Sequence, residues 1–180
     1  MNLETLILAA GKGTRMKSKI PKVLHKVCGK PMLQYVIEAA KKIGSTREVV
    51  VIGSGAELVR KNISGVEFVL QAEQLGTGHA VLSAKKNFAD SKGTVLILCG
   101  DTPLLTSELL KRFTDAHEKS NCAATVLTAE MPDATGYGRV IREEDGSFKK
   151  IVEDKDANAE EKKIREVNAG VYCFDVQKLF

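Results

Sequence analysis

Leu6-Ile7-Leu8-Ala9-Ala10-Gly11-Lys12-Gly13-Thr14-Arg15-Met16 is an apolar run that ends abruptly in glycines and cations, and Pro21-Lys22 follows it. Such a run is typical of a buried strand, and the glycines after it let the backbone approach a ligand closely. Successive backbone N–H groups in a loop of this kind form an anion cradle. Arg15 and Lys22 add positive charge, whereas Lys12 is expected to be a solvated surface residue. The stretch predicts a strand followed by a polyphosphate-binding loop, with a plain structural turn as the alternative.

Two familiar phosphate-binding loops do not match this stretch. Gly11-Lys12-Gly13 lacks the Gly-Lys-Ser/Thr order of the P-loop. Met16 stands where a dinucleotide-binding fingerprint needs its third small residue. The next predicted strand ends in Ile52-Gly53-Ser54-Gly55, without the acidic residue that would bind a ribose. An NAD-dependent oxidoreductase is therefore the least favoured function.

Composition excludes several other classes of protein. The chain has 180 residues, of which 43% are hydrophobic and 28% charged, as in ordinary globular domains. The net charge of +4 is mild and its cations are spread out, so we expect no nucleic-acid partner. We also expect neither a signal peptide nor a membrane span. The scattered cysteines predict reduced thiols in the cytoplasm, and neither they nor the scattered histidines have zinc-ligand spacing: Cys28, Cys99, Cys122, Cys173, His25, His79 and His117.

Predicted strands and helices alternate through the first two thirds of the chain. Strands are expected at residues 3–9, 48–52, 66–70, 94–99 and 122–130. Helices are expected between them at residues 31–43, 56–62, 78–87 and 107–119, the last with Thr106 as N-cap. Continuous apolar strands between helices indicate an α/β fold, with a mostly parallel sheet covered by helices on both faces.

The alternation of predicted strands and helices ends at about Pro132. Strands are predicted at residues 137–142 and 148–153, joined by a turn at Glu144-Asp145-Gly146. A charged helical stretch is expected at residues 155–163, then a strand at 164–174 and the beginning of a helix at 175–180.

Three unusual segments follow strands that a parallel sheet would align, so their side chains are expected to meet at one edge. They are residues 11–15, 71–78 and 100–101. Asp101 suits a magnesium ion completed by phosphate oxygens and water, or it caps a turn before Pro103. Gln71 offers an amide that can bind the polar edge of a base. Thr77 could cap a helix instead, and His79 is expected to pack rather than to act in catalysis.

The second half of the chain offers fewer candidates. Gly138 at a strand start could let a sugar lie on the backbone, and Glu153 and Asn168 could bond sugar hydroxyls or an amide. Ordinary turns and surface residues are the alternative. Arg15 and Lys22 could stabilise charge on a phosphate in transfer. No spacing predicts a covalent nucleophile.

With these residues assembled, residues 8–16 followed by Pro21-Lys22 resemble the signature of sugar-nucleotide pyrophosphorylases, on a Rossmann-like nucleotidyltransferase fold. Residues 71–80, 100–104, 135–139 and 166–170 narrow the resemblance to the bacterial N-acetylglucosamine-1-phosphate uridylyltransferases, the N-terminal halves of bifunctional enzymes. The resemblance implies that UTP and N-acetylglucosamine 1-phosphate give UDP-N-acetylglucosamine, which feeds cell-wall precursor synthesis, and pyrophosphate.

The same resemblance implies roles for particular residues. Leu8, Ala10 and Gly11 would line the nucleotide site, with Gln71, Gly76 and Thr77 on the uracil. Arg15 and Lys22 would bind phosphates and act in catalysis, and Asp101 would bind Mg²⁺. Gly138, Glu153 and Asn168 would hold the sugar. Residues 1–180 would form a single domain, with a nucleotide-binding part at 1–130 and part of the sugar-binding region at 131–180.

The chain departs from the family in two respects. The family completes its metal site with an Asn beyond Phe180, and its acetyltransferase half, through which the full-length protein forms a homotrimer, is absent. We therefore expect a C-terminally truncated domain whose activity is weak or lost. The alternatives are another sugar-phosphate nucleotidyltransferase of the same fold, transferring CMP or dTMP, and a nucleotide-binding fragment without activity.

Overall fold

The chain divides into two compact units in the computed structural model, which describes residues 2–180 apart from the side chain of Arg15. The first unit runs to Thr125 and includes the C-terminal segment Tyr172–Phe180. The second unit is Val126–Val171. The two units are described separately below.

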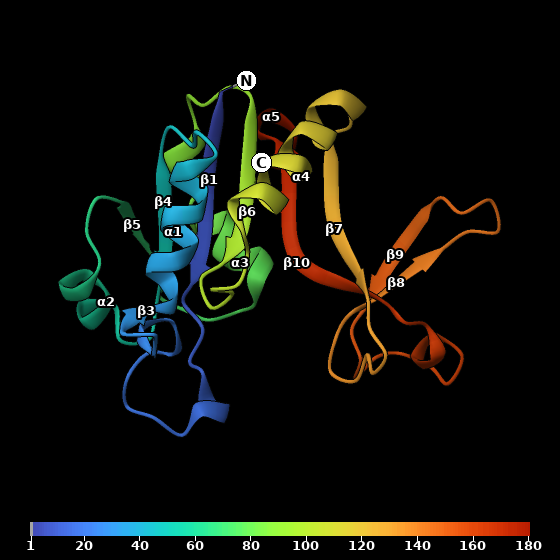
Figure 1. Cartoon of the computed structure of the whole chain (residues 1–180), viewed down its shortest axis with the longest axis horizontal. Coiled ribbons are helices and arrows are strands. Elements are labelled where there is room, and N and C mark those ends of the chain that lie inside the picture. The colour runs from blue at the N-terminus through green and yellow to red at the C-terminus, as the bar shows by residue number, and fades with distance from the viewer. Residues whose placement is uncertain (1) are drawn as a thin grey trace. The chain divides into compact units, whose positions relative to one another are not determined.

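The first unit is built on four parallel strands in the order β5 (Glu67–Leu70), β4 (Glu48–Ile52), β1 (Leu3–Ala9) and β6 (Thr94–Cys99) (Figure 1). The C-terminal part of β10 (Glu166–Asp175) pairs antiparallel with β6 on the far side. β1 therefore lies centrally. The next strands along the chain, β4 and β5, lie on one side of it, and β6 lies on the other. Such a reversal of strand order opens a crevice at the carboxyl ends of the strands, where α/β sheets bind their ligands.

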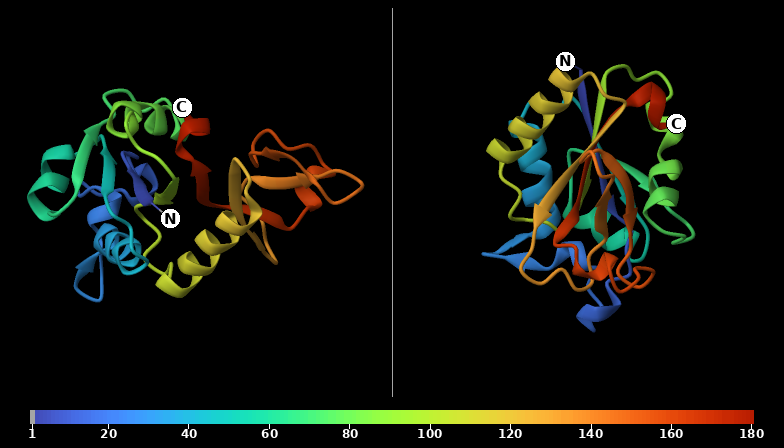
Figure 2. Two further views of the ribbon diagram at one scale, coloured as in Figure 1. Left: turned by 90° about the horizontal axis from the view of Figure 1, so that it is seen from above. Right: turned by 90° about the vertical axis from the view of Figure 1, so that its right-hand side faces the viewer.

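Helices cover both faces of this sheet. α1 (Met32–Lys42) and α4 (Ser107–Ser120) lie on one face, and α3 (Thr77–Ser83) and α5 (Val176–Leu179) on the other (Figure 2). The short helix α2 (Ala56–Asn62) joins β4 to β5. The expected α/β fold is confirmed, and so is Thr106 as N-cap, because its Oγ1 accepts a hydrogen bond from the Leu109 N–H.

The core of this unit follows from the alternation of side chains along β1. Leu6 is fully buried and packs with residues from β4, β6 and α3 in one apolar cluster. Ala9, on the opposite face, is also buried and lies beside Leu33 of α1 close to Gly100. Each fully buried Leu or Val contributes about 1.5–3 kcal/mol, so residues on both faces of β1 hold the sheet between its helices.

Two segments of the first unit differ from the expectation. The helix expected at 78–87 ends at Ser83, because the Ala84 N–H bonds to the Val81 carbonyl and the chain tightens into the 3₁₀ turn η3 (Lys85–Phe88). A small hairpin between β2 (Lys26–Val27) and β3 (Lys30–Pro31) was not predicted, because its strands are too short to show a periodicity.

The second unit contains the antiparallel hairpin of β8 (Arg139–Arg142) and β9 (Phe148–Val152). Its turn is closed by the Gly146 N–H donating to the Glu143 carbonyl, as the sequence predicts. Val167 of β10 pairs with Arg139, and β7 (Ala124–Glu130) pairs with β10. Arg139 is buried and its guanidinium donates to Asp154, 2.9 Å away.

The prediction of a helix at residues 155–163 is wrong. Only the 3₁₀ turn η4 (Glu161–Lys163) forms there. Asn158 and Glu161 exchange backbone-to-side-chain hydrogen bonds of 2.9 Å in a capping box, which starts a turn. The segment has no apolar stripe to bury, so the turn does not propagate into a helix.

Among the helices of residues 2–180, we find none with the length and apolar character that crossing a bilayer would require.

Candidate active site

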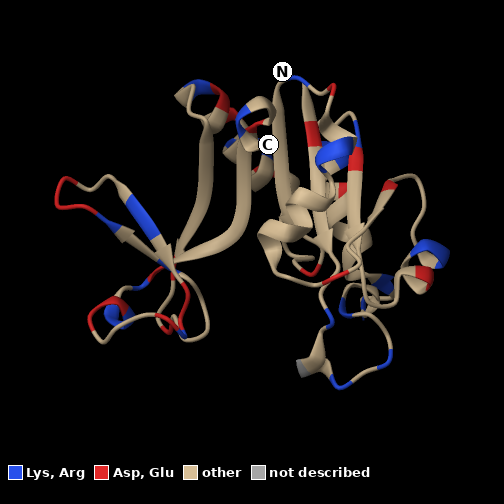
Figure 3. Cartoon of the chain, turned by 180° about the vertical axis from the view of Figure 1, so that it is seen from behind, with Lys and Arg blue, Asp and Glu red and all other residues tan. Residues whose placement is uncertain are grey.

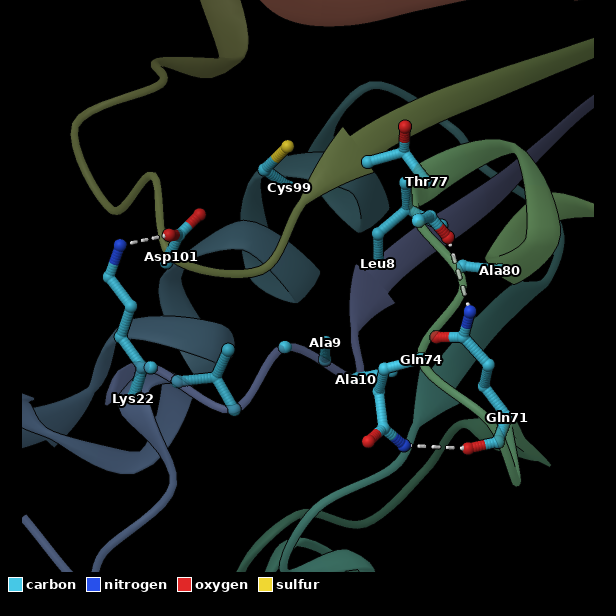
Figure 4. Close-up of a pocket in the computed structure, with 14 residues that line it drawn as sticks. Leu8, Ala9, Ala10, Lys22, Gln71, Gln74, Thr77, Ala80, Cys99 and Asp101 are labelled. Atoms are coloured by element: carbon cyan, nitrogen blue, oxygen red, sulfur yellow. Dashed lines mark hydrogen bonds and ion pairs between the residues drawn. The ribbon is translucent and has the colours of Figure 1, made fainter. Parts of the chain in front are cut away.

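A cavity of about 420 Å³ lies at the carboxyl ends of β1, β5 and β6, where the three segments singled out in the sequence come together (Figure 4). Its lining includes eight of the predicted site residues, namely Leu8, Ala10, Gly11, Lys22, Gln71, Gly76, Thr77 and Asp101. Arg15 falls outside this comparison because its side chain is not described.

The loop after β1 brings Lys22 to this cavity. Gly13 takes the left-handed conformation with φ of 59°, and a Cβ built on it would lie 2.8 Å from the Lys22 Cβ. On its other side the loop packs against Gly55 through Pro21. A Cβ built on Gly55 would lie 2.5 Å from the Pro21 Cγ. Glycine is therefore required at both contacts for the chain to return Lys22 to the end of β1.

This loop is also strongly basic (Figure 3). Between Gly11 and Pro31 the sequence has no Asp or Glu, and its cations are Lys12, Arg15, Lys17, Lys19, Lys22, Lys26 and Lys30. Lys12 is exposed, as expected. Cations clustered beside a cavity raise the local concentration of anionic ligands.

Asp101 is the carboxylate of the cavity, and its position is set by the end of β6. The Gly100 N–H donates to the Leu8 carbonyl over 2.9 Å, and Thr102 Oγ1 donates to the Cys99 carbonyl over 2.7 Å. Lys22 Nζ lies 2.5 Å from Asp101 Oδ2, and both side chains are about one third exposed, at 36% and 28%. The cavity therefore contains a paired positive and negative charge at the end opposite Gln71 (Figure 4).

Cys99 also lines the cavity, although the sequence suggested no role for it. Burial raises the pKa of its thiol, and the Asp101 carboxylate raises this pKa further, while Lys22 lowers it. A thiol with a raised pKa is a poor nucleophile at neutral pH. The cysteine therefore does not offer covalent catalysis, in agreement with the sequence.

The far end of the cavity is formed by Gln71 and the loop that follows it. Gln71 is 3% exposed, and its Nε2 donates to the Gly76 carbonyl over 3.1 Å. The same nitrogen lies 3.0 Å from Nδ1 of His79, a residue for which the sequence predicted only packing. Gln74 was missed as a lining residue, and its Nε2 donates to the Gln71 backbone carbonyl over 3.1 Å. The spacing of three between the two glutamines was the available signal.

The second unit gathers the three residues predicted to hold a sugar. The Asn168 N–H donates to the Gly138 carbonyl over 2.9 Å. A Cβ built on Gly138 would lie 3.4 Å from Glu153 Oε1, so the carboxylate lies directly over the glycine. Asn168 Oδ1 accepts from the Gly170 N–H over 2.9 Å. Gly138 itself is buried, and Ile151 Cγ2 lies 3.0 Å from the same Cβ position, so the glycine leaves room for the Ile151 and Glu153 side chains.

The described residues contain no group of three or more His, Cys, Asp or Glu side chains that could hold a metal ion. Mg²⁺, however, is commonly bound through one or two carboxylates together with substrate phosphates and water. Asp101 supplies one such carboxylate at the cavity. The donor set therefore fits a magnesium ion that arrives with a nucleotide, and does not fit an all-protein metal site.

Comparison with known proteins identifies curated relatives over the whole chain. The bifunctional protein GlmU of Exiguobacterium sibiricum is 56% identical over 181 residues, which cover 100% of this chain and 40% of that protein. The bifunctional protein GlmU of Bacillus cereus is 52% identical over 180 residues, covering 99% of this chain and 39% of that protein. The chain thus spans about 40% of the length of the curated relatives it matches.

Solved structures share its fold. The UDP-glucose pyrophosphorylase complexed with UDP-glucose matches with a TM-score of 0.80 and 23% identity, covering 98% of this chain and 77% of that one. HddC from Yersinia pseudotuberculosis matches with a TM-score of 0.74 and 25% identity, covering 98% of this chain and 78% of that one. Residues 5–144, most of the chain, match the family described as the MobA-like NTP transferase domain, and this chain belongs to that family.

Proposed function

We propose that this chain is a uridylyltransferase domain that converts UTP and N-acetylglucosamine 1-phosphate into UDP-N-acetylglucosamine and pyrophosphate. The observation that carries the proposal is the cavity at the carboxyl ends of β1, β5 and β6. Its lining combines a glycine loop, a buried amide and a Lys–Asp pair. The identity of more than half to proteins named GlmU over the whole chain supports the choice of substrates.

In this proposal the base of UTP lies against Gln71, Gly76 and Thr77, and its triphosphate extends toward Lys22. Leu8, Ala10 and Gly11 form the wall between these two ends. Gly11 is exposed and nothing lies within 4 Å of a Cβ built on it, so its backbone is accessible to a phosphate. Arg15 is proposed as a second phosphate-binding cation from its place in the loop.

The proposed chemistry requires no general base and no covalent intermediate. At neutral pH the second pKa of a phosphate monoester, about 6, leaves the sugar phosphate largely a dianion. One of its oxygens attacks the α-phosphorus and forms the new P–O bond. The bond from the α-phosphorus to the bridging oxygen breaks, and pyrophosphate leaves with the electron pair. Catalysis is then positioning and charge stabilisation, and Lys22 is the described side chain suited to the latter.

Asp101 is proposed as the protein ligand of Mg²⁺. Bound there, the ion would neutralise charge on the phosphates. Lys22 Nζ already lies 2.5 Å from Asp101 Oδ2, so the carboxylate faces a positive charge at the position proposed for the ion.

The second unit is proposed to supply the sugar ligands Gly138, Glu153 and Asn168, with Glu153 and Asn168 bonding hydroxyl and acetamido groups. The cysteines of the described residues are not joined to one another in disulfides, and we propose a cytoplasmic location. The homotrimer expected of the full-length family protein stays a prediction.

The experiment that tests the proposal is pyrophosphate release from UTP and N-acetylglucosamine 1-phosphate with Mg²⁺, for the unmodified chain and for Asp101→Ala. CTP, dTTP and glucose 1-phosphate replace the natural substrates in parallel reactions. Release with UTP and the acetamido sugar, lost in Asp101→Ala, supports the proposal. Preference for another base or sugar would assign the chain to a related transferase, and UTP binding without turnover would make it an inactive nucleotide-binding domain.

A further inference from the structure

Gln71 and His79 are joined by a side-chain hydrogen bond at the base end of the cavity, from the end of β5 to the first turn of α3. Gln71 Nε2 lies 3.0 Å from His79 Nδ1 and 3.1 Å from the Gly76 carbonyl oxygen. An amide nitrogen can only donate, so His79 Nδ1 is the acceptor and its ring proton is on Nε2. Both hydrogens of the Gln71 amide are thus engaged by the protein.

This arrangement determines which atom of Gln71 a ligand meets. With both N–H groups turned to Gly76 and His79, the carbonyl oxygen Oε1 is on the side of the amide that faces the cavity (Figure 4). The amide cannot turn over without placing its oxygen against the Gly76 carbonyl and the His79 lone pair. Because Gln71 is 3% exposed, water offers little compensation for those lost bonds.

His79 is itself held in place by its helix. Its carbonyl accepts a hydrogen bond of 2.8 Å from Ser83 Oγ, and the Ala80 N–H donates to the Gly76 carbonyl over 3.1 Å. Gly76 reaches this position with φ of 104°, a conformation that favours glycine. The backbone of His79 and the Gly76 carbonyl are therefore held within one loop and helix turn, from which the imidazole reaches Gln71.

We propose that His79 is a positioning residue that sets the base preference of the site by fixing the orientation of the Gln71 amide. An outward Oε1 accepts from the N3–H of uracil, whereas N3 of cytosine carries a lone pair that would face the same oxygen. This inference rests on the proposed function, because it assumes that a pyrimidine nucleotide occupies this cavity. It assigns selectivity to a residue that contacts Gln71 rather than the base.

Binding of UTP and CTP measured by calorimetry tests the inference without requiring turnover. His79→Leu removes the acceptor at similar volume, and His79→Asn is the matched control because its amide oxygen lies near the position of Nδ1. Loss of one hydrogen bond is worth up to about tenfold in an equilibrium. We expect the preference for UTP over CTP to fall about tenfold in His79→Leu and to survive in His79→Asn.

Equal weakening of UTP and CTP in His79→Leu would overturn the inference, since it would show that His79 only shapes the loop. The unmodified chain separates this failure from that of the proposed function. If it binds no UTP, or binds CTP equally well, the proposed function fails and the inference fails with it. Nitrogen NMR of the unmodified chain gives a second readout that does not depend on any variant folding. The Nε2-protonated tautomer of His79 is expected, and the Nδ1-protonated tautomer would contradict the proposal.

Discussion

Lys22 and Asp101, which are far apart in the sequence, form an ion pair of 2.5 Å inside the candidate active site. Lys22 follows Pro21 at the start of the 3₁₀ turn η2 (Lys22–Leu24), and Asp101 follows β6. The pair joins the loop after β1 to the loop after β6. In the proposed reaction, Lys22 and Asp101 contribute more to the rate of phosphate transfer than to the stability of the fold.

Lys22→Met is therefore expected to separate activity from stability. A partly exposed ion pair contributes up to about 1 kcal/mol to folding, whereas removing a cation that stabilises a reacting phosphate costs about a hundredfold or more in rate. Lys30→Met is the matched control, because Lys30 pairs with Glu38 at 2.6 Å with a similar exposure of 37%. Thermal unfolding and pyrophosphate release are measured on both variants. Equal activity in the two would remove Lys22 from the proposed mechanism.

Gly13→Ala is expected to displace Lys22. The new Cβ would lie 2.8 Å from the Lys22 Cβ, in addition to the cost of φ at 59°. Gly29→Ala has the same kind of backbone strain, with φ of 83°, but no atom within 4 Å. Backbone strain should cost each variant about 1 kcal/mol of stability, and the clash should add to this loss in Gly13→Ala, as measured by urea unfolding. Only Gly13→Ala should lose activity, by about a hundredfold, and activity retained in it would show that the loop tolerates the clash.

Glu153→Gln is expected to act on the sugar phosphate alone. Loss of a charged hydrogen-bond acceptor should raise the KM for N-acetylglucosamine 1-phosphate about tenfold and leave the KM for UTP unchanged. Glu143→Gln serves as control, because Glu143 pairs at 3.0 Å with Lys149 on the surface of the same unit. A parallel rise in both KM values for Glu153→Gln would argue against a sugar-binding role.

The buried thiol of Cys173 is expected to make the protein less stable as the pH rises above about 9. It is fully buried on β10, and burial raises the pKa of its thiol from 9.0 to about 12. Between these values the unfolded chain releases a proton that the folded chain retains. The free energy of unfolding therefore falls as pH rises, by about 1.4 kcal/mol per pH unit. Urea unfolding of Cys173→Ala should show a lower stability at neutral pH but a flatter alkaline decline, and equal slopes for the two proteins would exclude this thiol as the cause.

Most of the parallel sheet could be predicted from the sequence because three of its strands, β1, β4 and β6, are apolar runs followed within two residues by glycine. The unbroken Val and Ile of β4 are an example, since a strand buried on both faces leaves few alternatives. Residues 155–163 were misjudged for the opposite reason. Six of these nine residues are charged, and the capping pair Asn158–Glu161 starts a turn that no packing extends.

The meeting of the site segments was predictable, but the contacts within the site were not. The rule that ligands bind at the carboxyl ends of parallel strands brings residues 11–15, 71–78 and 100–101 to one edge. The hydrogen bond between Gln71 and His79 depends on how α3 is rotated over the sheet. The local sequence of residues 71–80 does not determine that rotation. The ion pair of Lys22 with Asp101 likewise depends on the path of a loop that Gly13 and Gly55 make possible.

The most direct measurement is an NMR titration of UTP with Mg²⁺ into the unmodified chain. A second cavity of about 360 Å³ lined by Lys92, His117 and Asn121 serves as an internal control. If the cavity at the carboxyl ends of β1, β5 and β6 is the nucleotide site, the backbone amide resonances of Gly11, Gly76 and Asp101 shift on UTP addition and those of the control residues do not. Shifts confined to the control cavity, or none at saturating UTP, would contradict it.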